Sequence, residues 1–243
     1  MNYEYLNSDI EWIKQYPKHW KIDRIKDKTI NVAGGDWGND RDSDAEGENI
    51  VVLRVADLDD IYFNYDNLTI RKIKKSSYKS RKLTEKCLII EKSGGGEKQF
   101  VGRVGFPKDI SFKAICSNFM AKIDFDNTVD TKFMNFVFLN LYNNNLNYPY
   151  VQQTTGIQNL NVTYYLTTKV AFPPIEEQRV ISSYLETLLD EINEIKKIKF
   201  GTTKPSYGDN SRNQLKVLLE YRDSLIHECV TGKKQIYKGN LGE

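Results

Sequence analysis

Residues 172–200 of the chain, FPPIEEQRVISSYLETLLDEINEIKKIKF, decide its fold. The prolines at 173 and 174 disfavour a helix before them and allow one to begin after them. Glu176 and Glu177 fall in the first turn, where carboxylates favour the helix dipole. Isoleucine and leucine then recur at a/d spacing: Ile181, Leu185, Leu188, Ile192 and Ile195. This pattern predicts a long helix with a coiled-coil seam, although a plain amphipathic helix could show the same over two heptads.

A second helix is predicted over residues 211–230, with Gly232 as its stop. One face carries Leu215, Leu218, Leu219, Arg222, Leu225, Ile226 and Cys229. The polar stretch GTTKPSYGDN at 201–210 separates the two helices. Such a pair can pack on itself, on the preceding domain or on another chain, and a slender helical pair usually needs a partner.

The residues before position 172 predict a mixed, strand-rich domain. Short β-favouring runs lie at 49–55, 87–90, 100–106 and 119–123, and apolar residues at helical spacing predict a buried helix over 130–144. The glycine-rich segment 34–49 reads as a long loop. The fold class is therefore α+β: a mixed, strand-rich domain over 1–172, a helical region over 173–235 interrupted at about 200–211, and a tail over 236–243.

Composition excludes several classes of protein. There is no apolar run long enough to span a membrane, and the N-terminus lacks the pattern of a secretory signal. Three distant cysteines, Cys87, Cys116 and Cys229, fit neither a disulfide framework nor a zinc site and suit a reducing cytosol. Only two histidines occur. We therefore expect a cytoplasmic protein with no metal site.

Sequence motifs for catalysis are absent. No phosphate loop, nucleophile elbow or Asn-Pro-Pro-Tyr-like motif for base amino-methylation occurs, and no acidic cluster with lysine stands out as a nuclease centre. We therefore expect no catalytic residues.

Three segments are suited to contact with nucleic acid. Residues 71–86 hold eight basic residues and one acid, Glu85, which suits a phosphate-facing surface or an ordinary solvated face equally. Residues 91–99 and 152–161 are polar loops with amides, hydroxyls and lysines, which can contact base edges. Each loop taken alone also reads as a plain turn between strands. Trp20 and Trp37 are predicted to be packing residues.

Four segments in order resemble the specificity subunits of type I restriction–modification systems. They are SDIEWI…YPKHWKI at 8–22, VLRVADL at 52–58, GIQNLN at 156–161 with FPPIEEQ at 172–178, and EYRDSLI…VTGK at 220–233. The resemblance covers nearly the whole chain.

The resemblance implies a non-catalytic subunit of a DNA adenine methyltransferase and endonuclease complex. Its recognition domain would read half of a bipartite site in double-stranded DNA, and its helices would dock methylation subunits. Those subunits would bind S-adenosylmethionine, and a motor–nuclease subunit can join. We expect DNA contact from Arg71, Lys72, Lys74, Lys75, Lys92, Ser93, Lys98, Gln99, Arg103, Gln152, Gln153, Thr154, Thr155, Gln158 and Asn159. We expect subunit contact from Ile181, Leu185, Leu188, Ile192, Leu218 and Leu225.

The chain departs from the family pattern in two ways. Family members carry two recognition domains and two helical regions, and this sequence shows one of each, so it resembles a half-subunit that pairs with a second copy or with another half-specificity chain. Residues 201–211 also interrupt a region that is usually a continuous helix. Three alternatives stay open: a DNA-binding module of another defence or regulatory assembly, an unrecognised nuclease, and a truncated remnant.

Overall fold

The computed structural model describes residues 3–96, 99–154, 156–200 and 210–237. The chain divides into two compact units. Unit 1 comprises residues 1–22 and 171–243, and unit 2 comprises residues 23–170. Strands β3 (Lys21–Arg24) and β17 (Lys169–Phe172) each cross the boundary between them. The predicted domain limits differ from these units in one respect, because the first 22 residues group with the C-terminal helices.

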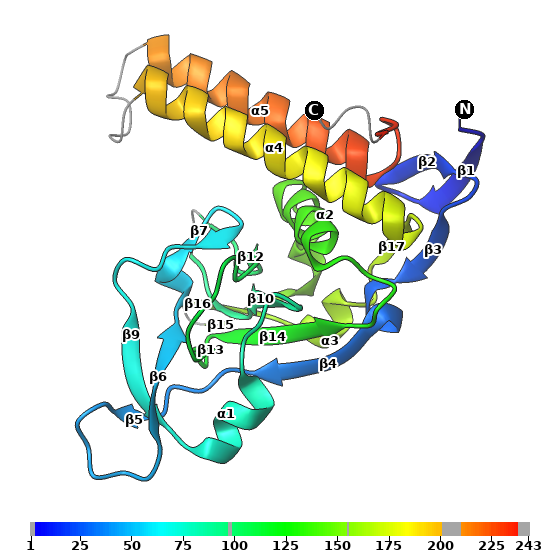
Figure 1. Ribbon diagram of the computed structural model, residues 1–243. Coiled ribbons are helices and arrows are strands. Elements are labelled where there is room, and N and C mark those ends of the chain that lie inside the picture. The colour runs from blue at the N-terminus through cyan, green and yellow to red at the C-terminus, as the bar shows by residue number, and fades with distance from the viewer. Residues whose placement is uncertain (1–2, 97–98, 155, 201–209, 238–243) are drawn as a thin grey trace. The chain divides into compact units, whose positions relative to one another are not determined.

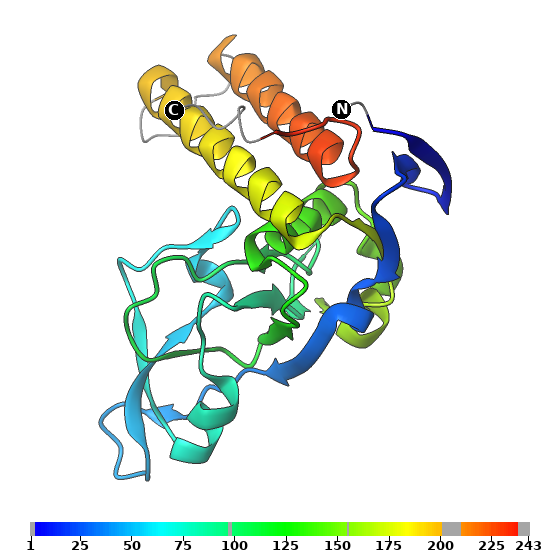
Figure 2. The ribbon, with the colours of Figure 1, turned by 45° about the vertical axis from the view of Figure 1, so that its right-hand side comes forward.

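Unit 1 combines a hairpin with the two predicted helices (Figure 1). The hairpin pairs β1 (Tyr5–Ile10) with β2 (Ile13–Pro17) in antiparallel register. Helices α4 (Ile175–Phe200) and α5 (Asn210–Val230) run side by side in opposite directions, as Figure 2 also shows. Both helices lie where the apolar spacing predicted them. The predicted interruption at 200–211 falls almost entirely outside the described residues.

The buried stripe of α4 departs from the predicted seam. Ile181, Leu185, Leu189 and Ile192 are buried, whereas Leu188 is half-buried and Ile195 is 39% exposed. The spacing of the buried residues is therefore four, four and three. A straight helix has 3.6 residues per turn, so its buried face drifts away from a strict heptad. Leu188 and Ile195 therefore lie outside the stripe that is buried within this chain.

Unit 2 is built on two four-stranded sheets. The first has the order β12-β10-β14-β4 and is antiparallel at each pairing. The second has the order β13-β6-β9-β5, in which β13 and β6 are parallel. Their bounds are β4 (Thr29–Gly34), β5 (Asn39–Asp40), β6 (Glu48–Leu53), β9 (Thr69–Ile73), β10 (Cys87–Glu91), β12 (Val104–Gly105), β13 (Ala114–Cys116) and β14 (Met120–Phe125).

Smaller elements complete unit 2. A three-stranded sheet has the order β11-β16-β15, and a hairpin pairs β7 with β8. Their bounds are β7 (Leu58–Asp59), β8 (Tyr62–Phe63), β11 (Ser93–Gly94), β15 (Val151–Thr154) and β16 (Ile157–Leu160). The helices are η1 (Ile25–Lys28), η2 (Val55–Asp57), α1 (Lys75–Arg81), α2 (Thr131–Asn143), η3 (Tyr148–Tyr150) and α3 (Val162–Tyr165).

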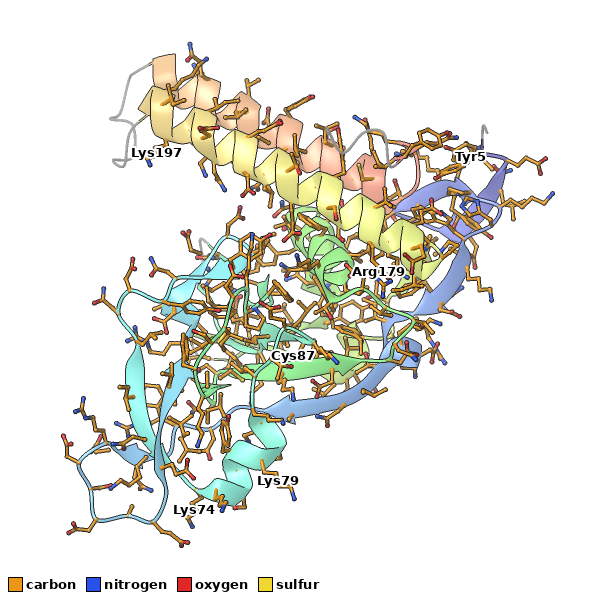
Figure 3. All side chains as sticks on the ribbon, in the orientation of Figure 1. Tyr5, Lys74, Lys79, Cys87, Arg179 and Lys197 are labelled. Carbon is orange, nitrogen blue, oxygen red and sulfur yellow. The ribbon has the colours of Figure 1, made fainter. Side chains whose placement is uncertain are left out.

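Side-chain alternation along β6 builds the core of unit 2. Leu53 packs in a cluster with Cys87, Ile89 and Met120 of the first sheet. Ile50 and Val52 point the other way, into a cluster that Tyr78 of α1 covers. Because successive side chains of a strand face opposite sides, one strand serves both clusters. Figure 3 shows Cys87 within this packed interior.

The predictions of α2, β6, β10 and β14 are confirmed, because each expected run coincides with the observed element. Helix α2 begins at the cap Asp130, whose side chain accepts from the Phe133 N–H at 2.8 Å. The run at 100–106 forms only the short strand β12, and the predicted loop 34–49 contains the two-residue strand β5. No described helix is long and apolar enough to span a membrane.

Candidate nucleic-acid interface

The two predicted polar loops meet in the three-stranded sheet of unit 2. Ser93 of β11 pairs with Asn159 of β16, and the Ser93 hydroxyl donates to Asn159 Oδ1 at 2.6 Å. Gln152 and Gln153 stand exposed on the neighbouring strand β15. Segments about 60 residues apart in sequence thus present hydroxyl and amide groups on one small sheet.

Gln158 has a different position from its neighbours. Its side chain is 2% exposed. Its Oε1 accepts from the Val101 N–H at 3.0 Å, and its Nε2 donates to Gly96 O at 3.2 Å. Residues on β16 alternate in exposure, so Ile157 and Asn159 face outward while Gln158 faces inward. Gln158 was predicted to contact DNA, but its amide is bonded to the backbone of Val101 and Gly96.

Arg103, another predicted DNA contact, is partnered as well. Its Nε donates to Glu91 Oε2 at 3.2 Å, and its guanidinium reaches Val55 O at 3.4 Å. Glu91 is only 3% exposed, and burial raises the pKa of its carboxyl, although Arg103 opposes that rise. The Arg103 side chain therefore orders a buried carboxyl rather than projecting into solvent.

The basic stretch divides into two parts. Arg71 on β9 lies with its guanidinium 4.9 Å from the Trp37 ring centre, donates to Trp37 O at 3.1 Å and pairs with Asp40. Lys72 donates to Ser43 O at 2.6 Å. Lys74 and Lys75, at the start of α1, are exposed, and Figure 3 shows Lys74 and Lys79 projecting outward from that helix. The exposed Lys74 and Lys75 therefore suit phosphate contact better than Arg71 and Lys72, which already have partners.

The remaining predicted DNA contacts are less defined. Lys92 is half-buried and Gln99 is exposed. Thr154 is described only as part of the β15 backbone, and Lys98 and Thr155 lie outside the described residues.

A pocket of about 410 Å³ lies among these elements, entirely within unit 2. Its lining includes Trp37, Arg54, Glu91, Ser93, Ser117 and Phe119. Trp37 and Phe119 are 37% and 48% exposed, so two aromatic rings are accessible to solvent here. Trp37 is therefore not a core residue, although its ring packs against the Arg71 guanidinium. Trp20, at 3% exposure, does pack as predicted.

Sequence reasoning missed Arg54, Ser117, Asn118 and Phe119 as residues of this site. Arg54 is held in place by a bidentate pair with Asp57, with Nη2 to Oδ1 at 2.5 Å. The other three form the turn before β14. A Ser-Asn-Phe turn between two strands gives little signal by itself, because such residues favour turns in any protein.

The helical pair of unit 1 presents different side chains from those predicted. Ile181, Leu185, Ile192 and Leu225 are buried within the single chain, and Leu188 and Leu218 are half-buried. The four buried side chains cannot form a docking surface while they stay covered. Exposed apolar side chains lie instead near the loop end of the pair: Ile195, Ile198, Val217 and Tyr221. Ile195, Val217 and Tyr221 line a groove of about 470 Å³ between the helices.

The described acidic, histidine and cysteine side chains do not gather into a metal-binding group, and the cysteines are buried. No group of three or more His, Cys, Asp or Glu side chains among the described residues could hold a metal ion. The three cysteines are buried, and burial raises the pKa of the Cys87 thiol to about 11. A thiol with so high a pKa is a poor nucleophile at neutral pH.

This protein combines two parts: an α+β unit whose polar loops lie around a pocket with aromatic residues, and a pair of long helices. The family model described as "Type I restriction modification DNA specificity domain" matches residues 17–200. The chain belongs to this family, and it is therefore a DNA specificity domain. No curated protein matches it.

Two solved structures are similar in fold. The HsdS subunit from Thermoanaerobacter tengcongensis has a TM-score of 0.52 at 13% identity, over 95% of this chain and 48% of that chain. A chain from a study of complex assembly and conformational transition of the type I R-M system has a TM-score of 0.56 at 13% identity, over 96% and 49%. This chain spans about half the length of both.

Proposed function

We propose that this chain is the sequence-reading, non-catalytic subunit of a type I restriction–modification complex. Unit 2 reads one half of a split site in double-stranded DNA, and the helical pair docks methylation subunits. The observation that carries the proposal is that Trp37 and Ser93 line one pocket, while Arg71 contacts Trp37 and Asn159 accepts from Ser93. All four residues lie within residues 17–200, which match the family model, and this supports the proposal.

In this proposal the partner subunits, and not this chain, carry out methyl transfer and DNA cleavage. The methylation subunits bind S-adenosylmethionine and transfer its methyl group to adenine, and a motor–nuclease subunit joins the complex for cleavage. The division is physically reasonable, because base-edge contacts set sequence preference while phosphate contacts set affinity. The complex acts in the cytoplasm, where its DNA lies.

Methylation mapping tests the proposal. The chain is co-expressed with its methylation subunit, and genomic adenine methylation is compared with and without the gene. We expect methylation at one short, split sequence that disappears when the gene is deleted. An unchanged methylome with the partner expressed contradicts the proposal. DNA binding without any methylation partner would instead indicate a module of another assembly, and cutting by the chain alone would indicate an enzyme.

We further propose that a second copy of the chain completes the bipartite site. The groove between α4 and α5 exposes Val217 at 63% and Tyr221 at 57%, and this apolar surface supports contact with another copy. A two-fold pair would present two identical half-site readers.

The oligomeric state in solution tests the pairing. We expect a dimer by light scattering, and Val217→Asp should shift it to monomer because a charge would enter the apolar groove. Lys216→Asp is the matched control, since Lys216 is a neighbouring exposed residue outside the lining. A chain that stays monomeric until a different specificity chain is added would favour the heterologous pair.

A further inference from the structure

The pocket beside Trp37 is lined by Ser117, whose buried hydroxyl has incomplete bonding among the described residues. Ser117 is 2% exposed, and its Oγ has no hydrogen-bond partner there. Burying a hydroxyl without a partner is costly, so such groups are rare in proteins unless something else binds them. Ser117 lines the pocket, which suggests that a ligand supplies the missing partner.

Glu91 adds a second polar group. Its Oε2 accepts from Arg103 Nε, and backbone N–H groups of Gly102 and Arg103 also hydrogen-bond the carboxyl. Its Oε1 lies on the side of Gly94, another lining residue. A Cβ at Gly94 would lie 3.2 Å from Oε1. Because glycine has no Cβ, that oxygen remains approachable from the pocket. A carboxylate oxygen in this position accepts from N–H groups.

The apolar surfaces of the pocket suit a flat ring. Trp37 and Phe119 are both partly exposed residues of the pocket lining, and stacking on aromatic side chains is a usual way in which proteins hold an unstacked base. A volume of about 410 Å³ lies in the range of small-molecule sites and is ample for one base. Arg54, fixed by Asp57, stands at the same pocket and can face a phosphate.

We propose that this pocket receives a single nucleobase, unstacked from the bound DNA, that carries an exocyclic amine. The amine donates to Glu91 Oε1, Ser117 completes the edge contacts, and Trp37 and Phe119 hold the faces. This inference rests on the proposed function, since it assigns a mode of reading to the same surface. It makes Ser117 and Glu91 specificity-determining residues, although neither projects from the surface.

A mismatch scan tests the inference. Each duplex carries the methylated sequence and one abasic site, so that a single base has lost its pairing partner. The affinity of the chain with its partner subunits is measured for each duplex. Where base edges are read in the groove, a disrupted pair should weaken binding about tenfold or more. At the position read by the pocket, which differs from the adenine that the methylation subunit itself unpairs, it should tighten binding at least about threefold, because the base no longer has to be unpaired.

Pocket variants connect that signal to these residues. Ala56 lines the pocket and is exposed, so Ala56→Trp should block it without disturbing the core, and the tightening should vanish. Ala45→Trp, outside the lining, should retain it. Ser117→Ala should weaken binding of the intact site about fivefold. Thermal melting of each variant checks the fold.

The outcomes separate the two ideas. Sequence-specific binding with no position of tightening overturns the inference and leaves the proposed function standing. Tightening that persists in Ala56→Trp, or that occurs only opposite thymine, also overturns it. Absence of sequence-specific binding under all conditions overturns the proposed function and the inference together.

Discussion

Glu177 ties the N-terminal hairpin to the helical pair within unit 1. Its Oε1 accepts from the Tyr3 hydroxyl at 2.6 Å and from the Trp20 Nε1–H at 3.0 Å, and its Oε2 lies 2.8 Å from His19 Nε2. Sequence alone assigned this carboxylate to the helix dipole. The structure adds three side-chain partners that lie more than 150 residues away along the chain.

Glu177→Ala should lower the free energy of unfolding by about 1–3 kcal/mol, because the Trp20 and Tyr3 donors lose their acceptor. Urea denaturation followed by tryptophan fluorescence measures the loss. Glu176→Ala is the control, since Glu176 is 73% exposed and pairs only with Arg179 on the surface. That variant should stay within about 0.5 kcal/mol of the wild type. Equal losses in the two variants would contradict the assigned role of Glu177.

Glu91 makes stability depend on pH. Burial raises the pKa of its carboxyl in the folded chain above the ordinary value of 4.5, so the folded state binds more protons than the unfolded state. Stability from this group is therefore present at low pH and is lost as pH rises from about 4.5 through the folded pKa. Glu91→Gln cannot titrate, so its stability relative to wild type should improve steadily as pH rises from 4 to 7. Urea titrations at several pH values measure this, and a constant difference would contradict it.

At the scale of the element, the buried stripe of α4 distinguishes adjacent leucines. Leu189 is 3% exposed, whereas Leu188 is half-buried. Leu189→Ala should lower the free energy of unfolding by about 2–4 kcal/mol, because it removes buried methyl groups and leaves a cavity. Leu188→Ala should cost about 1 kcal/mol. The heptad seam makes the opposite prediction, so denaturation of the two variants decides between them.

On strand β16, too, the sequence does not reveal which of two adjacent residues is buried. Gln158 and Asn159 are adjacent polar residues in a polar segment, and composition treats them alike. Because side chains alternate along a strand, one residue supports the loop and the other faces out. The register of the strand decides which amide can contact DNA, and the surrounding pairing with β11 and β15 sets that register.

At the scale of the molecule, the exposed lysines of α1 should set the salt dependence of DNA binding. Each phosphate contact contributes about 0.9 to the slope of log affinity against log salt concentration. The double variant Lys74→Ala/Lys75→Ala should therefore reduce that slope by about 1–2 without changing sequence preference. Lys14→Ala/Lys21→Ala removes two exposed lysines outside the basic stretch and should leave the slope unchanged. Fluorescence anisotropy at several salt concentrations measures both, and equal slopes in both would contradict this role of α1.

The sequence by itself determined the two helices, the strands β6, β10 and β14, the helix α2 and the resemblance to type I specificity subunits. These features depend on local periodicity and on short motifs, which act over a few residues. They were therefore readable along the chain.

Only the tertiary structure decided that Gln158 is buried, that Trp37 is accessible, that Leu189 replaces Leu188 in the stripe, and that residues 1–22 group with the C-terminal helices. It also brought Trp37, Glu91 and Ser117 to one pocket from three separate segments. Which face of an element is covered depends on what packs against it, and that packing joins residues whose distance along the chain carries no information about their distance in space.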